Sequence, residues 1–174
     1  MVSPTTHTQH DRAAHLTDVM GSVAPDLLVY FERRVPRDAA PDLVAETMMT
    51  AWRRLAVTPS DFVEARMWLF GIARNVLNNA NRGARRRTRL ADRLRDLRQD
   101  SDDIAPPADE GAAVRDAIDR LPPELADLIK LVHWEGMTLA QAAEILAISA
   151  STAQRRYLRA KAALRAALVT EMNA

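Results

Sequence analysis

The side chains best suited to bind another molecule lie late in the chain, between residues 151 and 159. Arginine can bridge the two acceptors of guanine, and glutamine can pair with adenine. Hydroxyl groups and backbone amides at a helix start can bind phosphate. The pattern therefore predicts binding to duplex DNA and leaves open which side chains read bases. The candidates are Ser151, Thr152, Gln154, Arg155, Arg156 and Arg159.

Two short helices separated by a tight break are expected to position these side chains. Thr138 and Gln141 have the spacing of a capping box, which predicts the start of the first helix. Ser149 or Ser151 can cap the second helix. On that second helix one stripe is apolar, while Thr152 and the three arginines share a neighbouring face. This pattern favours a helix-turn-helix whose second helix enters the major groove. A solvated helical hairpin with a basic face is the alternative.

A further polar face is predicted on a helix that runs from about Val63 to an arginine-rich segment. Leu69, Ile72 and Val76 share its apolar face, almost opposite the polar one. The basic cluster beside this helix suggests contacts with phosphate, although a charge run is often only solvated surface. The polar face consists of Arg74, Asn78, Asn81, Arg82 and Arg85.

Composition excludes several other kinds of site. The 174 residues include no cysteine, so disulfides and thiolate zinc sites are excluded. His7, His10 and His15 have no neighbouring ligands that would make a metal site, and no nucleophile, acid–base pair or glycine-rich phosphate loop is evident. We expect no enzyme activity and no cofactor. Neither an export leader nor an apolar run of about 18 residues is present, which predicts a cytoplasmic protein without membrane insertion.

Helical periodicity alone predicts an all-α fold of two small domains joined by a flexible linker. Residues 1–20 are polar and read as a mobile tail, and residues 21–97 form the first domain. Residues 98–111 gain acids and two prolines, which is typical of an extended linker. Residues 112–174 form the second domain, which contains the helix-turn-helix.

Taken in order, several short segments closely resemble the bacterial sigma factors of the extracytoplasmic-function group. They are residues 42–47, 51–53, 68–75, 121–124 and 135–138. The resemblance covers about residues 22–168 and implies a promoter-specificity subunit of RNA polymerase. By this resemblance the first domain, region two, binds core polymerase and melts the downstream promoter element. The second, region four, reads the upstream element as duplex.

The resemblance also implies roles for single residues. Asp42 and Glu46 lie one helical turn apart and would bind polymerase arginines, although Asp42 also suits a helix start. The loop from Val57 to Arg66, which contains Phe62, would hold a flipped base, and the polar face would track the melted strand. Asn75 either touches bases or only caps exposed surface. An anti-sigma protein is an expected partner.

Two other function classes stay open at this stage. One is a stand-alone helix-turn-helix regulator whose first half dimerises or senses a signal, and the other is a sigma-like adaptor or decoy. Departures from the family pattern concentrate at Ala147, Ser151 and Ala153. A left-handed alanine at position 147, where the turn usually has glycine, would cost about 1 kcal/mol.

Overall fold

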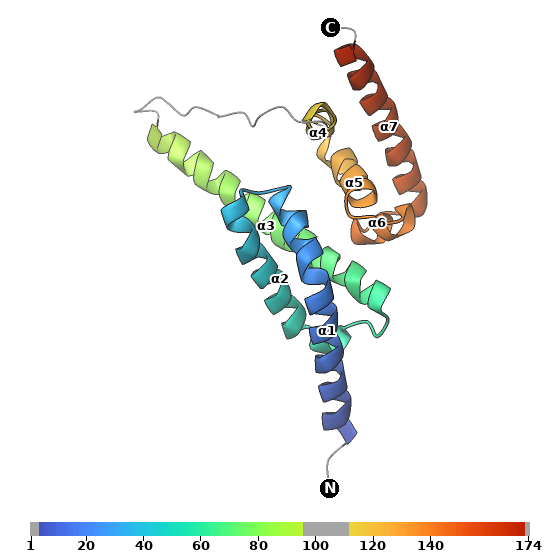
Figure 1. Cartoon of the computed structure of the whole chain (residues 1–174). Coiled ribbons are helices and arrows are strands. Elements are labelled where there is room, and N and C mark those ends of the chain that lie inside the picture. Colours follow the sequence, from blue (N-terminus) through green and yellow to red (C-terminus); the bar gives the residue numbers. More distant parts are fainter. Residues whose placement is uncertain (1–3, 96–111, 173–174) are drawn as a thin grey trace. The chain divides into compact units, whose positions relative to one another are not determined.

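The computed structural model describes the backbone of residues 4–95 and 112–172 (Figure 1). Its described part contains helices and no strand, which confirms the predicted all-α fold. The chain divides into two compact units, residues 1–99 and 100–174, so the division falls inside the predicted linker. The linker itself, residues 98–111, lies outside the described residues.

The described residues of the first unit form three long helices. They are α1 (Pro4–Glu32), α2 (Ala40–Arg53) and α3 (Phe62–Arg95), with short 3-10 turns η1 (Arg37–Ala39) and η2 (Leu55–Val57) between them. All three helices pack against one another. Tyr30 lies edge-on to both Phe31 and Phe70, with its ring centroid 5.2 and 5.5 Å from theirs, and all three side chains are buried.

The prediction of a mobile tail over residues 1–20 is wrong for residues 4–20, which belong to α1. Leu16, Val19, Val23 and Leu27 recur at steps of three and four residues, and all four are buried. Gly21 and Pro25 lie within this stretch, and both residues are typical of turns and helix ends. The helix was therefore not predicted from the sequence. Pro25 is nevertheless exposed within the continuous helix.

The described residues of the second unit form four helices around a small core. They are α4 (Ala112–Asp119), α5 (Pro123–His133), α6 (Leu139–Ile145) and α7 (Ala150–Met172). Trp134, Tyr157 and Leu164 pack against a buried apolar cluster. That cluster is formed by Ile118, Leu121, Leu125, Ala126, Ile129 and Ala160. Helix α7 contacts α4, α5 and α6, so this core fixes the helix that carries the predicted DNA-binding face.

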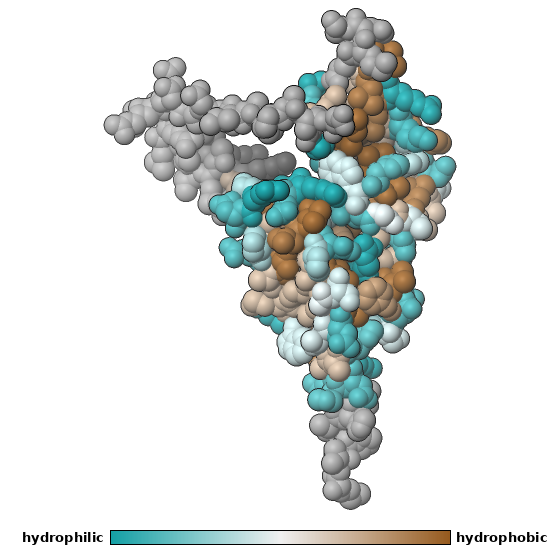
Figure 2. Space-filling view, in the orientation of Figure 1, coloured by the Kyte–Doolittle hydropathy of each residue, from teal (hydrophilic) through white to brown (hydrophobic). Residues whose placement is uncertain are grey.

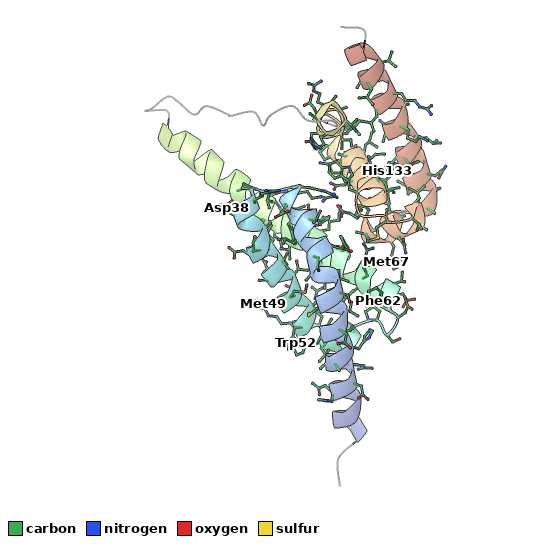
Figure 3. The ribbon with its side chains drawn as sticks, viewed as in Figure 1. Asp38, Met49, Trp52, Phe62, Met67 and His133 are labelled. Carbon is green, nitrogen blue, oxygen red and sulfur yellow. The ribbon has the colours of Figure 1, made fainter. Side chains whose placement is uncertain are left out.

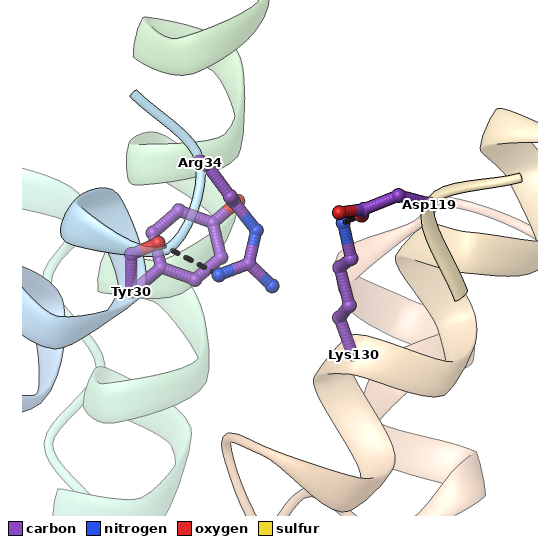
Figure 4. Close-up of polar contacts among 4 residues, drawn as sticks. All are labelled: Tyr30, Arg34, Asp119 and Lys130. Atoms are coloured by element: carbon purple, nitrogen blue, oxygen red, sulfur yellow. Dashed lines mark hydrogen bonds and ion pairs between the residues drawn. The ribbon is translucent and has the colours of Figure 1, made fainter. Parts of the chain in front are cut away.

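In each unit, a charged side chain makes a polar contact near the end of a helix (Figure 4). In the first unit, Arg34 Nη1 donates to the Tyr30 carbonyl oxygen at 2.7 Å, and its guanidinium lies 3.8 Å from the Tyr30 ring centroid. In the second unit, Lys130 Nζ lies 2.7 Å from Asp119 Oδ1 and joins α5 to the last residue of α4. Each contact restrains a chain segment where regular backbone hydrogen bonding ends.

Candidate nucleic-acid interface

Helix α6 begins with the capping box that the sequence predicts. Gln141 N donates to Thr138 Oγ1 at 3.2 Å, and Thr138 N donates to Gln141 Oε1 at 2.8 Å. Two backbone donors that would otherwise lack partners at the helix start are satisfied in this way. The start of the helix-turn-helix is therefore confirmed.

The turn after α6 is a Schellman motif closed by an alanine. Ile148 N donates to Ala143 O and Ala147 N donates to Glu144 O, each at 3.0 Å. Ala147 has φ 54°, the left-handed conformation that this position requires and that glycine adopts without steric cost. The left-handed alanine considered from the sequence is present.

Ser149, rather than Ser151, caps the start of α7. Its Oγ accepts a hydrogen bond from Thr152 N at 3.2 Å and donates to Thr152 Oγ1 at 2.8 Å. Ser151 Oγ lies 3.1 Å from Ser149 Oγ and its side chain is exposed. Both hydroxyls proposed for phosphate binding are thus held at the first turn of α7.

One face of α7 is packed and the opposite face is open. Ala153 and Ala160 are fully buried, which orients the helix. Ser151, Gln154, Arg155 and Arg159 are exposed. Thr152 and Arg156 are half-buried and flank the packed stripe, so they lie at the edge of the polar face. The three arginines therefore lie on a face beside the packed stripe, as predicted, with Arg156 at its edge.

The sequence reasoning missed Leu158 on this open face. Its side chain is 58% exposed and lies three and four residues beyond Arg155 and Gln154, which places it beside both on the helix. An exposed leucine among polar side chains can contact the methyl group of thymine. The available signal was a leucine that breaks the period of the apolar stripe.

On α3 the structure supports the predicted opposition of an apolar and a polar face. Leu69, Ile72, Ala73, Val76 and Leu77 are buried. Opposite them, Asn75, Asn81 and Arg82 are exposed, while Arg74 and Asn78 are half-buried. Arg82 Nη2 donates to Asn79 Oδ1 at 2.6 Å, which restrains the arginine along the helix. The side chain of Arg85 lies outside the described residues.

Two buried polar atoms lack a hydrogen-bond partner within the described part of the chain. They are Arg74 Nε, on the polar face of α3, and Thr58 Oγ1, in the loop before α3. Buried donors and hydroxyls in folded proteins are nearly always satisfied, by protein, water or ligand. Both atoms lie in segments that the sequence analysis assigns to the melted strand.

Helix α3 begins at Phe62, one residue before the start predicted near Val63. The span 57–66, which the resemblance assigns to a base-holding loop, therefore includes the first residues of this helix. Asp61 Oδ1 accepts a hydrogen bond from Glu64 N at 3.0 Å and caps the helix, a signal that the sequence analysis overlooked. Phe62 and Val63 are 47% and 49% exposed at this helix start (Figure 3). An exposed aromatic is available there for a base.

Asp42 and Glu46 are both exposed on α2, one turn apart, and Asp42 lies in the first turn. Farther along this helix, Met49 and Trp52 are 55% and 49% exposed (Figure 3). An open groove of about 410 Å³ runs beside them and is lined by Met20, Met48, Met49, Trp52 and Arg53. Apolar side chains, brown and tan in Figure 2, reach the surface over α1 and α2. On α2, Asp42 and Glu46 are therefore followed by an exposed apolar surface that includes Met49 and Trp52.

Other kinds of site find no support among the described side chains. No group of three or more potential metal ligands occurs in that part of the chain. His133 Nε2 lies 3.0 Å from Tyr157 Oη, and the two rings stack, so this histidine links α5 to α7. No described helix has an apolar stretch long enough to cross a membrane.

Comparison with known proteins identifies both halves of the chain. Residues 21–87 match the family described as Sigma-70 region 2, and residues 111–164 match Sigma-70, region 4. The ECF RNA polymerase sigma factor SigL of Mycobacterium tuberculosis is 32% identical over 139 residues, which cover 78% of each chain.

Solved structures show the same architecture. The sigma factor RpoE of Bartonella quintana, in complex with the anti-sigma factor NepR, is 25% identical with a TM-score of 0.64, and the match covers 87% of this chain and 95% of RpoE. CnrH, in complex with the cytosolic domain of CnrY, is 22% identical with a TM-score of 0.55, covering 95% and 90% of the two chains. The likeness to CnrH shows the fold alone.

Proposed function

Because the chain belongs to the extracytoplasmic-function sigma factors of RNA polymerase, we infer that it binds core polymerase and directs promoter-specific transcription initiation. The observation that carries this inference is the order of the two matches in one chain. A region 2 unit precedes a region 4 unit that contains a capped helix-turn-helix. A stand-alone regulator whose first half dimerises or senses a signal would not need a region 2 unit there. As a specificity subunit, the protein catalyses no reaction of its own and works in the cytoplasm, with its polymerase.

The exposed face of α7 is proposed to read the upstream element in the major groove. Arg155 and Arg159 are exposed on the same side and have the reach for guanine edges or phosphates. Gln154 and Leu158 lie beside Arg155, so they suit adenine and the methyl group of thymine. Ser151 and Thr152 lie at the helix start, where hydroxyls and amides bind phosphate, and Arg156 contacts the backbone from the edge.

The polar face of α3 is proposed to hold the melted strand of the downstream element. Cationic and amide side chains along one helix face follow a phosphate backbone, while aromatic side chains stack with bases. Phe62, exposed at the start of α3, supplies the aromatic surface for the extruded base. The track consists of Arg74, Asn75, Asn78, Asn81, Arg82 and Arg85.

The acidic pair on α2 is proposed as the polymerase contact. Asp42 and Glu46 are exposed on the same side of the helix, so both carboxylates can accept hydrogen bonds from arginines of one partner helix. Met49 and Trp52 extend this side as an apolar surface, and aromatic and methionine side chains are enriched in the cores of protein interfaces. We also propose an anti-sigma factor as regulator, since the similar sigma factor RpoE was solved in complex with the anti-sigma factor NepR.

Reconstituted transcription tests the proposed function. The purified chain is mixed with bacterial core RNA polymerase and a genomic promoter library, and the transcript starts are sequenced against a reaction with core polymerase alone. Specific starts that depend on the chain are expected. Tight binding of the chain alone to a palindromic duplex, without a polymerase complex or specific starts, would instead identify a stand-alone regulator.

A further inference from the structure

The N-terminal half of α1 contacts the loop that precedes α3, although it lies before the segment that matches region 2. The match begins at residue 21, whereas His15 Nε2 lies 3.0 Å from the carbonyl oxygen of Pro59. A carbonyl oxygen only accepts, so the imidazole donates this hydrogen bond. His15 is half-buried, and α1 also packs against η2 just before the loop.

A second contact from α1 holds the start of α3, directly after this loop. Arg66 Nη2 lies 3.1 Å from Asp26 Oδ2, and the Arg66 guanidinium lies 4.9 Å from the centroid of the Phe70 ring. His15 and Asp26 are eleven residues apart, about three helical turns, so they lie on the same side of α1. The segment from Pro59 to Arg66 is therefore attached to one side of α1 near both of its ends.

The exposed apolar side chains of this segment lie between the two attachments. Phe62 and Val63 are about half exposed, and Asp61 caps the helix turn that carries them. A free loop would lose conformational entropy when it closes around a base, and a loop already held in place loses less. The contacts from α1 thus favour binding of the extruded base, although the α1 side chains that make them do not touch the DNA strand.

We propose that His15 is a positioning residue for promoter opening, because its hydrogen bond to Pro59 fixes the loop before α3, and the first turn of α3 presents Phe62 and Val63 to the extruded base. This inference rests on the proposed function of the first unit. Polymerase binding is assigned to a different helix, α2, so the contribution of His15 is separable from it.

The test compares four variants in reconstituted holoenzyme. H15A and H15L both remove the hydrogen-bond donor. H15L replaces the imidazole with an apolar side chain of similar size. H15Q keeps a donor at a similar reach. H10A removes an exposed histidine from the same helix and serves as the matched control. The template is a promoter fragment that the wild-type holoenzyme selects from a random DNA library. Opening is followed by permanganate reactivity of unpaired thymines, and core affinity by fluorescence anisotropy.

We expect H15A and H15L to reduce the opening equilibrium about 3- to 10-fold, which is the range for one hydrogen bond of this kind. Core affinity should stay within about twofold of wild type for all four variants, and H15Q and H10A should open the promoter as wild type does. Opening by H15L within twofold of wild type would overturn the proposal, as would equal defects in H15Q and H15L. Parallel loss of core affinity and opening would do the same. If the wild-type holoenzyme opens no promoter, the proposed function itself fails.

Discussion

Replacement of Ala147 by glycine should stabilise the second unit, although the same change elsewhere in a helical protein usually destabilises it. Ala147 has φ 54° in the Schellman motif that closes α6. A Cβ atom in this conformation costs about 1–2 kcal/mol. Removing the Cβ atom relieves this strain, but the greater freedom of glycine in the unfolded chain offsets roughly 0.5–1 kcal/mol of the stabilisation. Taking the middle of each range, the free energy of unfolding should therefore rise by about 0.75 kcal/mol.

Calorimetric unfolding of the full chain measures this effect, because the transitions of the two units can be followed separately. For a unit of this size, the expected gain corresponds to a rise of about 2–8 °C in the midpoint of the second unit. Ala162→Gly is the matched control, since Ala162 is exposed in the interior of α7. That change should lower the unfolding free energy by about 1 kcal/mol.

Opposite signs for the two alanine-to-glycine changes would support the left-handed turn. If Ala147→Gly lowers the midpoint as Ala162→Gly does, the assignment of backbone strain to Ala147 is refuted. Affinity for the upstream element should also be retained in Ala147→Gly, because glycine adopts the same backbone conformation and leaves the orientation of α7 unchanged.

Three further changes test the surfaces assigned to the two units. Glu46→Arg should weaken association with core polymerase at least about tenfold in an anisotropy titration, because a like-charge contact would replace the proposed ion pair. Asp18→Arg, at an exposed acid of α1, is the control, and unchanged affinity for Glu46→Arg would leave that face a structural role only. Thr138→Ala should lower the free energy of unfolding in urea by about 1 kcal/mol through loss of the cap, and an unaltered value would mean that the capping box adds nothing. A triple alanine variant of α7 should weaken binding to the upstream duplex and reduce the slope of log affinity against log salt by about 0.9 for each lost phosphate contact, whereas an unchanged slope would remove this helix from the DNA interface. The triple variant replaces Arg155, Arg156 and Arg159.

Most of the second unit could be predicted because its signals are local. Thr138 and Gln141 specify the start of α6 through hydrogen bonds within one turn, and the structure forms both bonds. Ala147 occupies the position where a helix-turn-helix turns, and the left-handed conformation follows from that place in the motif. The family assignment needed only short motifs in a fixed order, and the two matches confirm it.

Several features of the first unit could not be predicted from the sequence, because they depend on tertiary contacts. Leu16 and Val19 belong to an apolar stripe that Gly21 and Pro25 interrupt, and they are buried in a helix that packs against α2 and α3. The half-buried state of Arg156 likewise depends on how Ala153 and Ala160 orient α7 against its neighbours. Contacts between residues 44 positions apart, such as His15 with Pro59, leave no periodic signal.

The continuity of α1 through residue 21 has a practical consequence for dissecting this protein. A fragment cut where the region 2 match begins would discard Leu16 and Val19, which are fully buried. Burial of two such side chains is worth about 3–6 kcal/mol, a large share of the stability of a small domain. The recognisable family segment and the unit that folds are therefore different stretches of chain. A truncated first unit that fails to bind polymerase would report lost stability and say nothing about the polymerase contact.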